Sequence, residues 1–214
     1  MCIRDRYTSQ PDYWNKCEEI VGDAPSTLRL MLPEIYLERP GETEKIAAIR
    51  KAMHDYIDNG ILQNLGEGFV FTRRSVGGNT RSGLVVALDL ECYDYSKGST
   101  TLIRATEGTI VERIPPRLKI RDGALLELPH ILVLIDDEKK TVIEPLAEKL
   151  QNTEKLYDFD LMQNGGHIEG WFVNNEGMIE DVISALNALV DPNKYGTETV
   201  SYTHLRAHET CADL

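Results

Sequence analysis

The chain has 214 residues, 42% of them apolar and 27% charged, and a formal net charge of −12. This length suits one large domain or two small ones, and a chain of this size needs no cross-links to bury its core. The acidic balance disfavours nucleic acid as a partner, because binding through phosphate contacts needs a basic face. The sequence contains no run of about 18 apolar residues, which is the length that a membrane-spanning helix needs.

The two ends differ from the rest of the sequence. Residues 1–6 have no helical or strand period, and residues 200–214 read VSYTHLRAHETCADL. Both strings resemble translated sequencing adapters, so we expect residues 7–199 to be the domain fragment and both tails to add nothing to its core. On a helix, His204 and His208 would share one face and could offer two metal ligands. Because we interpret this tail as foreign, we do not count them as candidate functional residues.

Helix signals come first along the core. A helix is predicted from about Ser9 to Val21, and an extended stretch, Leu28–Leu37, follows it. A second helix has Thr43 as its N-cap and Gly60 as its stop. Its core face is predicted from apolar residues at helical spacing: Ile46, Ile49, Met53, Tyr56 and Ile57. His54 lies on the opposite, solvated face.

Strand signals dominate the middle of the chain. Phe69–Arg74 and Arg81–Glu91 are predicted strands joined by a Gly-Gly-Asn turn. The apolar run Leu84–Leu88 within the second strand predicts burial on both faces. Ile131–Ile135 is predicted to be a similar buried strand. It ends at Asp136–Asp137, which either mark a site at the strand end or, as we favour, form a turn and cap the next helix.

The last elements are a helix, a hairpin and a helix. The first helix is predicted over Val142–Leu150, and Leu156–Met162 and His167–Val173 form a hairpin turned at Asn164–Gly166. The final helix has a core face made of Ile179, Val182, Ile183, Leu186 and Leu189. Because strands and helices alternate irregularly, we expect an α+β (mixed α/β) fold: a single domain with a mixed sheet, hairpins and flanking helices.

The richest candidate for chemistry lies between residues 104 and 117. Arginine side chains grip phosphate bidentately, hydroxyls add donors, and a nearby carboxylate can act as a base or bind Mg²⁺. The alternative is a polar connection carrying surface ion pairs. Six residues would form the anion pocket: Arg104, Thr106, Glu107, Thr109, Arg113 and Arg117.

His167 is a further candidate, because it follows a Gly-Gly turn where the backbone could approach a ligand. The alternative, which we favour, is a residue of the hairpin turn without such a role. No metal site is expected from the sequence. The four cysteines show no metal-ligand spacing, and the N-terminus lacks the apolar region of a signal peptide, so a cytoplasmic protein with free thiols is expected.

Six stretches of the chain resemble the bacterial and archaeal family called domain of unknown function 1015. The resemblance runs from Tyr7 to about Tyr195. It implies a distant relation to ParB-like and sulfiredoxin-like folds, a group that includes free-serine kinases using ADP or ATP. The stretches are Tyr7–Trp14, Gly22–Gly41, Ser82–Ser99, Leu102–Arg121, Glu127–Asp137 and Leu156–Trp171.

The resemblance also implies roles for the residues of the anion pocket. Many family members read HExT where this chain has Thr106 to Thr109, so Thr106 replaces a histidine. Glu107 would be the base or a metal-linked carboxylate and Thr109 a phosphate contact. The arginines at 104, 113 and 117 would hold nucleotide phosphates.

The resemblance also implies a DGNH-like motif shortly after Tyr195, which is absent, and a native strand before Tyr7, which we expect to be missing. The chain is therefore interpreted as a fragment truncated at both ends and without kinase activity by itself.

Two functions follow as expectations. The leading one is small-molecule phosphotransfer of the serine-kinase type in amino-acid metabolism, with ADP or ATP and Mg²⁺ as cofactors. The alternative is a non-catalytic regulatory module that binds a nucleotide or an amino acid. In both cases the partner is a small molecule, and a ParB-like role on DNA ranks third because of the charge of −12.

Overall fold

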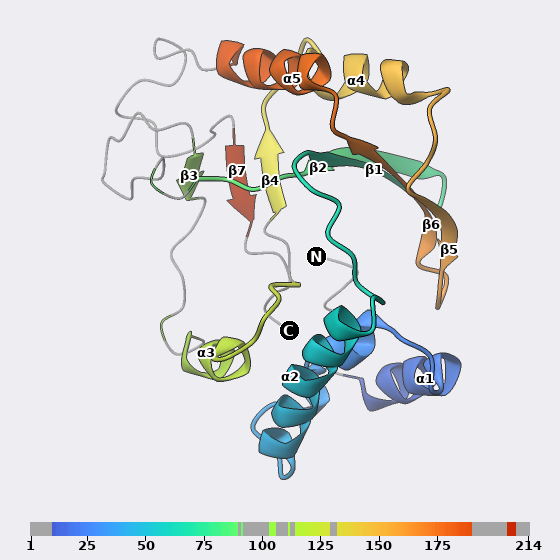
Figure 1. The fold of residues 1–214 in the computed structure, drawn as a ribbon, viewed down its shortest axis with the longest axis vertical. Coiled ribbons are helices and arrows are strands. Elements are labelled where there is room, and N and C mark those ends of the chain that lie inside the picture. The colour runs from blue at the N-terminus through green and yellow to red at the C-terminus, as the bar shows by residue number, and fades with distance from the viewer. Residues whose placement is uncertain are drawn as a thin grey trace. The chain divides into compact units, whose positions relative to one another are not determined.

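The computed structural model of the protein describes residues 10–89, 91, 103–105, 111, 114–128, 132–189 and 205–208, and Figure 1 shows its elements. These residues fall into two compact units. The helical unit comprises the described residues within 1–64 and 107–132, and the sheet unit those within 65–106 and 133–208. Each unit is built from separate segments, which is why no linker is visible in the sequence. Helices combined with a four-stranded antiparallel sheet confirm the predicted α+β class.

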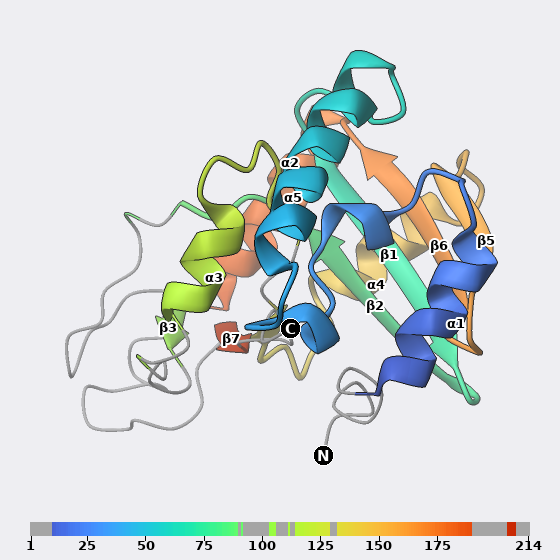
Figure 2. The same ribbon diagram turned by 90° about the horizontal axis from the view of Figure 1, so that it is seen from below.

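The helical unit is built from three α-helices and two 3₁₀ turns. They are α1 (Pro11–Val21), η2 (Thr27–Leu30), η3 (Glu34–Tyr36), α2 (Glu42–Asp58) and α3 (Ile114–Arg121). Figure 2 shows α3 beside α2, where the Arg50 guanidinium donates to the Lys119 carbonyl at 3.0 Å. The buried core of this unit consists of Leu30, Leu32, Ile46, Ile49, Met53 and Tyr56.

Helix α1 confirms the first predicted helix, and α2 confirms most of the second. His54 is exposed, as expected. The α2 N-cap is Gly41 rather than Thr43, and Ile57 is 42% exposed instead of facing the core. The prediction of an extended stretch at 28–37 was wrong, because the Ser26 hydroxyl caps the first 3₁₀ turn by accepting from the Leu28 N–H.

The sheet unit contains a four-stranded antiparallel sheet in the order β2-β1-β6-β5. Its strands are β1 (Phe69–Val76), β2 (Asn79–Val85), β5 (Tyr157–Leu161) and β6 (Gly166–Val173). Helices α4 (Ile143–Leu150) and α5 (Glu176–Ala188) cover one face of it, as Figure 1 shows. The buried core between helices and sheet consists of Phe71, Val142, Leu146, Leu150, Trp171, Val173 and Val182.

Both predicted hairpins of this sheet are confirmed, and two details are corrected. Strand β2 ends at Val85, and Leu88 is 40% exposed, so the predicted burial of 84–88 on both faces was wrong. The α5 core face includes Val182 but not Ile183, which is 46% exposed. In an antiparallel sheet only one face has to be covered, so the apolar residues after Val85 need not all be buried.

Strand β4 (Leu132–Ile135) belongs to a second, three-stranded sheet with β3 (Ile103–Ala105) and β7 (Leu205–His208), in the order β3-β7-β4. Strands β3 and β7 run parallel. From the sequence we expect residues 200–214 to form no packed element, whereas the main chain of 205–208 forms the middle strand of this second sheet. The foreign origin of residues 200–214 stays a prediction.

The turn after β4 confirms the favoured role of Asp137. Its carboxylate accepts hydrogen bonds from the Thr141 N–H at 2.6 Å and from the Val142 N–H at 2.9 Å, just before α4 begins. These bonds close the turn that leads to Val142, the N-cap residue of α4. Among the helices that the structure describes, none combines the length and the apolar character needed to cross a bilayer.

Candidate functional site

Charged side chains gather at one end of the four-stranded sheet, on the same face that α4 and α5 cover at the other end. Residues two apart on a strand share a face, and the register places Arg73 of β1 and Asp158 of β5 on either side of Glu169 in β6. Asp160 lies opposite His167 in the same way. We call this set the charged face: Arg73, Lys155, Asp158, Asp160, His167 and Glu169.

Glu169 is the centre of the charged face. One carboxylate oxygen accepts from the Arg73 Nε at 2.7 Å and the other from the Lys155 Nζ at 2.5 Å. The side chain is only 11% exposed. Hydrogen bonds from Arg73 and then Lys155 lower the pKa of Glu169 to about 2, against the opposing effect of its burial. Glu169 is therefore a fixed negative charge at any ordinary pH.

His167 bridges two aspartates at the exposed rim. Its Nδ1 lies 2.8 Å from Asp160 Oδ1, and its Nε2 lies 2.9 Å from Asp158 Oδ1. The hydrogen bond with Asp160, with smaller contributions from the neighbouring negative charges, raises the pKa of His167. Lys155 also contacts Asp158 at 2.5 Å, and this bond lowers the pKa of Asp158. Each carboxylate of the charged face thus contacts at least one basic group.

Trp171 connects the charged face to the hydrophobic core. It is 2% exposed and packs against Phe71, with ring centroids 5.6 Å apart. The Arg73 guanidinium carbon lies 5.2 Å and the Lys155 Nζ 5.6 Å from the Trp171 ring centroid, within the range of cation–π attraction. Both cations therefore lie between carboxylates and an aromatic ring.

A glycine fixes the register of the hairpin that carries His167. Gly166 has a φ of +87°, and a Cβ placed there would lie 2.1 Å from the main-chain oxygen of Ser75 in β1. Only glycine allows this conformation together with such a close approach of two strands. Since Gly166 is the first residue of β6, it determines where His167 and Glu169 meet their partners on β5 and β1.

The structure describes the predicted site residues unevenly. His167 lies in β6 within the charged face, so it is a strand residue rather than part of the turn. The main chain of Arg104 is in β3 and that of Arg117 in α3. The remaining members lie outside the described residues, and the convergence of the predicted anion pocket stays a prediction: Thr106, Glu107, Thr109 and Arg113.

Sequence reasoning missed the partners of His167, although a signal for some of them was present. The hairpin reads YDFDL before its turn and GHIEG after it. Asp158 and Asp160 are two positions apart on one strand, as are His167 and Glu169 on the next. Once the turn is located, this spacing places all four side chains on one face of the hairpin. Arg73 had no such signal, because its position beside Glu169 depends on the pairing of two strands that are distant in sequence.

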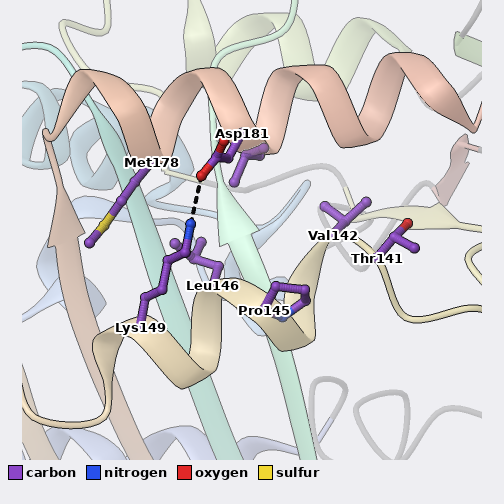
Figure 3. Close-up of a pocket in the computed structure, with 8 residues that line it drawn as sticks. Thr141, Val142, Pro145, Leu146, Lys149, Met178 and Asp181 are labelled. Carbon is purple, nitrogen blue, oxygen red and sulfur yellow. Dashed lines mark hydrogen bonds and ion pairs between the residues drawn. The ribbon is translucent and has the colours of Figure 1, made fainter.

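A small pocket lies between α4 and α5, and Figure 3 shows its lining. Its volume is about 30 Å³, which is room for one or two water molecules and not for a metabolite. The Lys149 ammonium and the Asp181 carboxylate form an ion pair of 2.6 Å at this site. This pocket is therefore not a candidate for a small-molecule site.

The fold and the site together define an α+β protein with an ion-paired, solvent-accessible sheet face. Residues 2–193 match the family described as Protein of unknown function (DUF1015), and the chain belongs to this family, as the resemblance in its sequence predicts. Comparison with the curated proteins and with the solved structures gave no match.

Proposed function

We propose that this protein serves a small-molecule phosphotransfer of the serine-kinase type, with ADP or ATP and Mg²⁺ as the phosphate source. Phosphoryl transfer depends mainly on positioning and on neutralising charge, so it needs cationic side chains and a carboxylate more than any special nucleophile. The arginines at 104, 113 and 117 would hold phosphates, Glu107 would act as the base or bind the metal, and Thr109 would donate to phosphate.

The observation that carries ligand binding is the charged face. An amino acid such as serine presents an ammonium group and a carboxylate, and this face offers acceptors in Asp158 and Glu169 and donors in Arg73 and Lys155. These groups are positioned by paired strands and by the buried Trp171, so little side-chain freedom would be lost on binding. A charged metabolite is the ligand class that this arrangement fits best.

The test uses a full-length member of the family with L-serine, ADP or ATP, and Mg²⁺. Phosphorus NMR should show phosphoserine, and glutamine at the position of Glu107 should abolish its formation while circular dichroism stays unchanged. Wild-type turnover in that variant would remove Glu107 from the mechanism. The absence of turnover with any donor would overturn the proposed activity.

A non-catalytic binding module is the second candidate, and the openness of the charged face favours it. The side chains of Asp160 and His167 are 88% and 41% exposed. Phosphotransfer sites usually exclude water when they close, whereas binding alone does not require enclosure. Calorimetry distinguishes the two candidates: a module binds serine or nucleotide without forming phosphoserine.

A further inference from the structure

The geometry points to a divalent transition-metal site on the charged face, with Asp158, His167 and Glu169 as its ligands. Each of these residues offers one ligand atom, and the three atoms lie within 4.8 Å of one another. Two come from adjacent positions of one face of β6 and the third from the neighbouring strand β5. The site goes beyond the proposed phosphotransfer, because metal binding requires neither a nucleotide nor an acceptor.

The distance between His167 and Asp158 suits a shared metal ion. Ligand atoms that each lie about 2.0–2.2 Å from an ion are roughly 3–3.5 Å apart at tetrahedral or octahedral angles. The His167 Nε2 and the Asp158 Oδ1 are 2.9 Å apart, so a small outward shift of either would suffice. The Glu169 oxygen has further to move, and rotation within its side chain can supply that movement.

Asp160 supplies the support that metal-binding histidines usually have. A histidine that binds a metal through one ring nitrogen commonly donates the other N–H to a carboxylate, which fixes the tautomer and the orientation of the ring. The His167 Nδ1 lies 2.8 Å from Asp160 Oδ1. With the proton on Nδ1, Nε2 would be the ligand atom, and it lies 2.9 Å from Asp158 Oδ1.

Lys155 shows that the site attracts a cation. Its ammonium lies 2.5 Å from Asp158 Oδ2 and 2.5 Å from Glu169 Oε1, so a positive charge of the chain itself already joins the two carboxylates. A metal ion would displace this ammonium. Lys155 has a flexible stem and is 35% exposed, so it can turn toward solvent. Arg73 would continue to hold the other oxygen of Glu169.

The ligand set indicates the class of metal. One imidazole and two carboxylates suit Zn²⁺, Mn²⁺, Co²⁺ or Fe²⁺ better than Mg²⁺ or Ca²⁺, which prefer ligand sets made of oxygen alone. Three protein ligands leave at least one coordination position for water or a substrate atom on this accessible face. The site is therefore suited to present a metal-bound ligand to solvent.

The test titrates the whole chain with Co²⁺ and follows the visible absorption of the bound ion, with Zn²⁺ as the competitor. His204→Gln and His208→Gln are introduced throughout, because these two histidines could bind metal elsewhere. We expect one equivalent of Co²⁺ to bind. Asp158→Asn or His167→Gln should abolish this signal, and Asp160→Asn should weaken binding about 10–100-fold. His54→Gln, which changes an exposed histidine on α2, is the matched control and should have no effect.

Lys155→Met gives the sharpest outcome, because it should tighten Co²⁺ binding by roughly tenfold, which corresponds to about 1.4 kcal/mol of competing attraction removed. A variant that fails to fold cannot produce a gain in affinity. Unchanged or weaker binding in Lys155→Met would overturn the proposal, as would wild-type affinity in Asp158→Asn and His167→Gln. Since no nucleotide or serine is present, these results are independent of the phosphotransfer assay.

Discussion

The two ends of one sheet face make an instructive contrast. At one end, Phe71, Trp171 and Val173 are almost fully buried beneath α4 and α5. At the other end, on the same strands and the same face, Arg73 and Glu169 continue the alternation but form a charged network that solvent reaches. Strand alternation decides which residues share a face, whereas the helices decide which part of that face is dry.

This contrast predicts that stability resides at the apolar end and ligand binding at the charged end. Trp171 lies where the two meet, because it packs against Phe71 and also lies beneath the two cations. The apolar end therefore supports the positions of the charged groups without itself contacting a ligand. Substitutions at the apolar end should therefore lower the stability of the fold, whereas substitutions at the charged end should mainly weaken ligand binding.

The largest effect is expected from Phe71→Ala, which should lower the free energy of unfolding by about 3–5 kcal/mol, because it leaves a cavity in a packed core. The matched control is Phe159→Ala, which changes a residue of the other sheet face that is 50% exposed. That control should cost less than about 1 kcal/mol. Urea denaturation measures both, and equal costs would contradict the assignment of the core.

The second prediction concerns Glu169 and acid. Its pKa of about 2 lies below the usual 4.5, so its contribution to stability is fully present above pH 4.5 and is lost as the pH falls toward 2. At full size this contribution is about 3 kcal/mol, with roughly 2 kcal/mol of it lost by pH 3. Denaturation at pH 6 and pH 3, with a chelator present, should therefore show a smaller loss of stability in Glu169→Gln than in the wild type. The same loss in both proteins would mean that Arg73 and Lys155 do not hold this carboxylate.

The third prediction compares two glycines with similar main-chain conformations. Gly166 and Gly78 have φ values of +87° and +83°, but only Gly166 approaches another strand. Both alanine variants should be strained, at a cost of about 1 kcal/mol. Gly166→Ala should cost about 1–3 kcal/mol more, because its Cβ would meet the Ser75 main chain. Equal melting temperatures of the two variants would show that the hairpin does not need this contact.

The smallest effect is expected from deleting residues 200–214. Their strand β7 lies between β3 and β4 in the small three-stranded sheet, and the four-stranded sheet that carries the core does not include it. The thermal midpoint should change little. A loss above about 2 kcal/mol, the scale of a buried side chain, would show that β7 is an integral strand.

Local patterns predicted the elements better than they predicted the site. The apolar spacing of α2 and the glycine turn of the β5–β6 hairpin depend on neighbouring residues, so the sequence alone indicated both. The 3₁₀ turn at 27–30 was missed, because a capping hydrogen bond from the Leu28 N–H to the Ser26 hydroxyl outweighed the extended pattern. The site required more, because the partners of Glu169 are Arg73 in β1 and Lys155 just before β5, and the strand order brings both beside β6.

The central claim is that the charged face is a ligand site and not merely an ion-paired surface. Its most direct test is anomalous diffraction at the zinc absorption edge from crystals of the chain grown with Zn²⁺. The account predicts a peak within bonding distance of Asp158, His167 and Glu169, with the Lys155 ammonium turned away from both carboxylates. Zinc bound only at other residues, with Lys155 still joining Asp158 to Glu169, would contradict it.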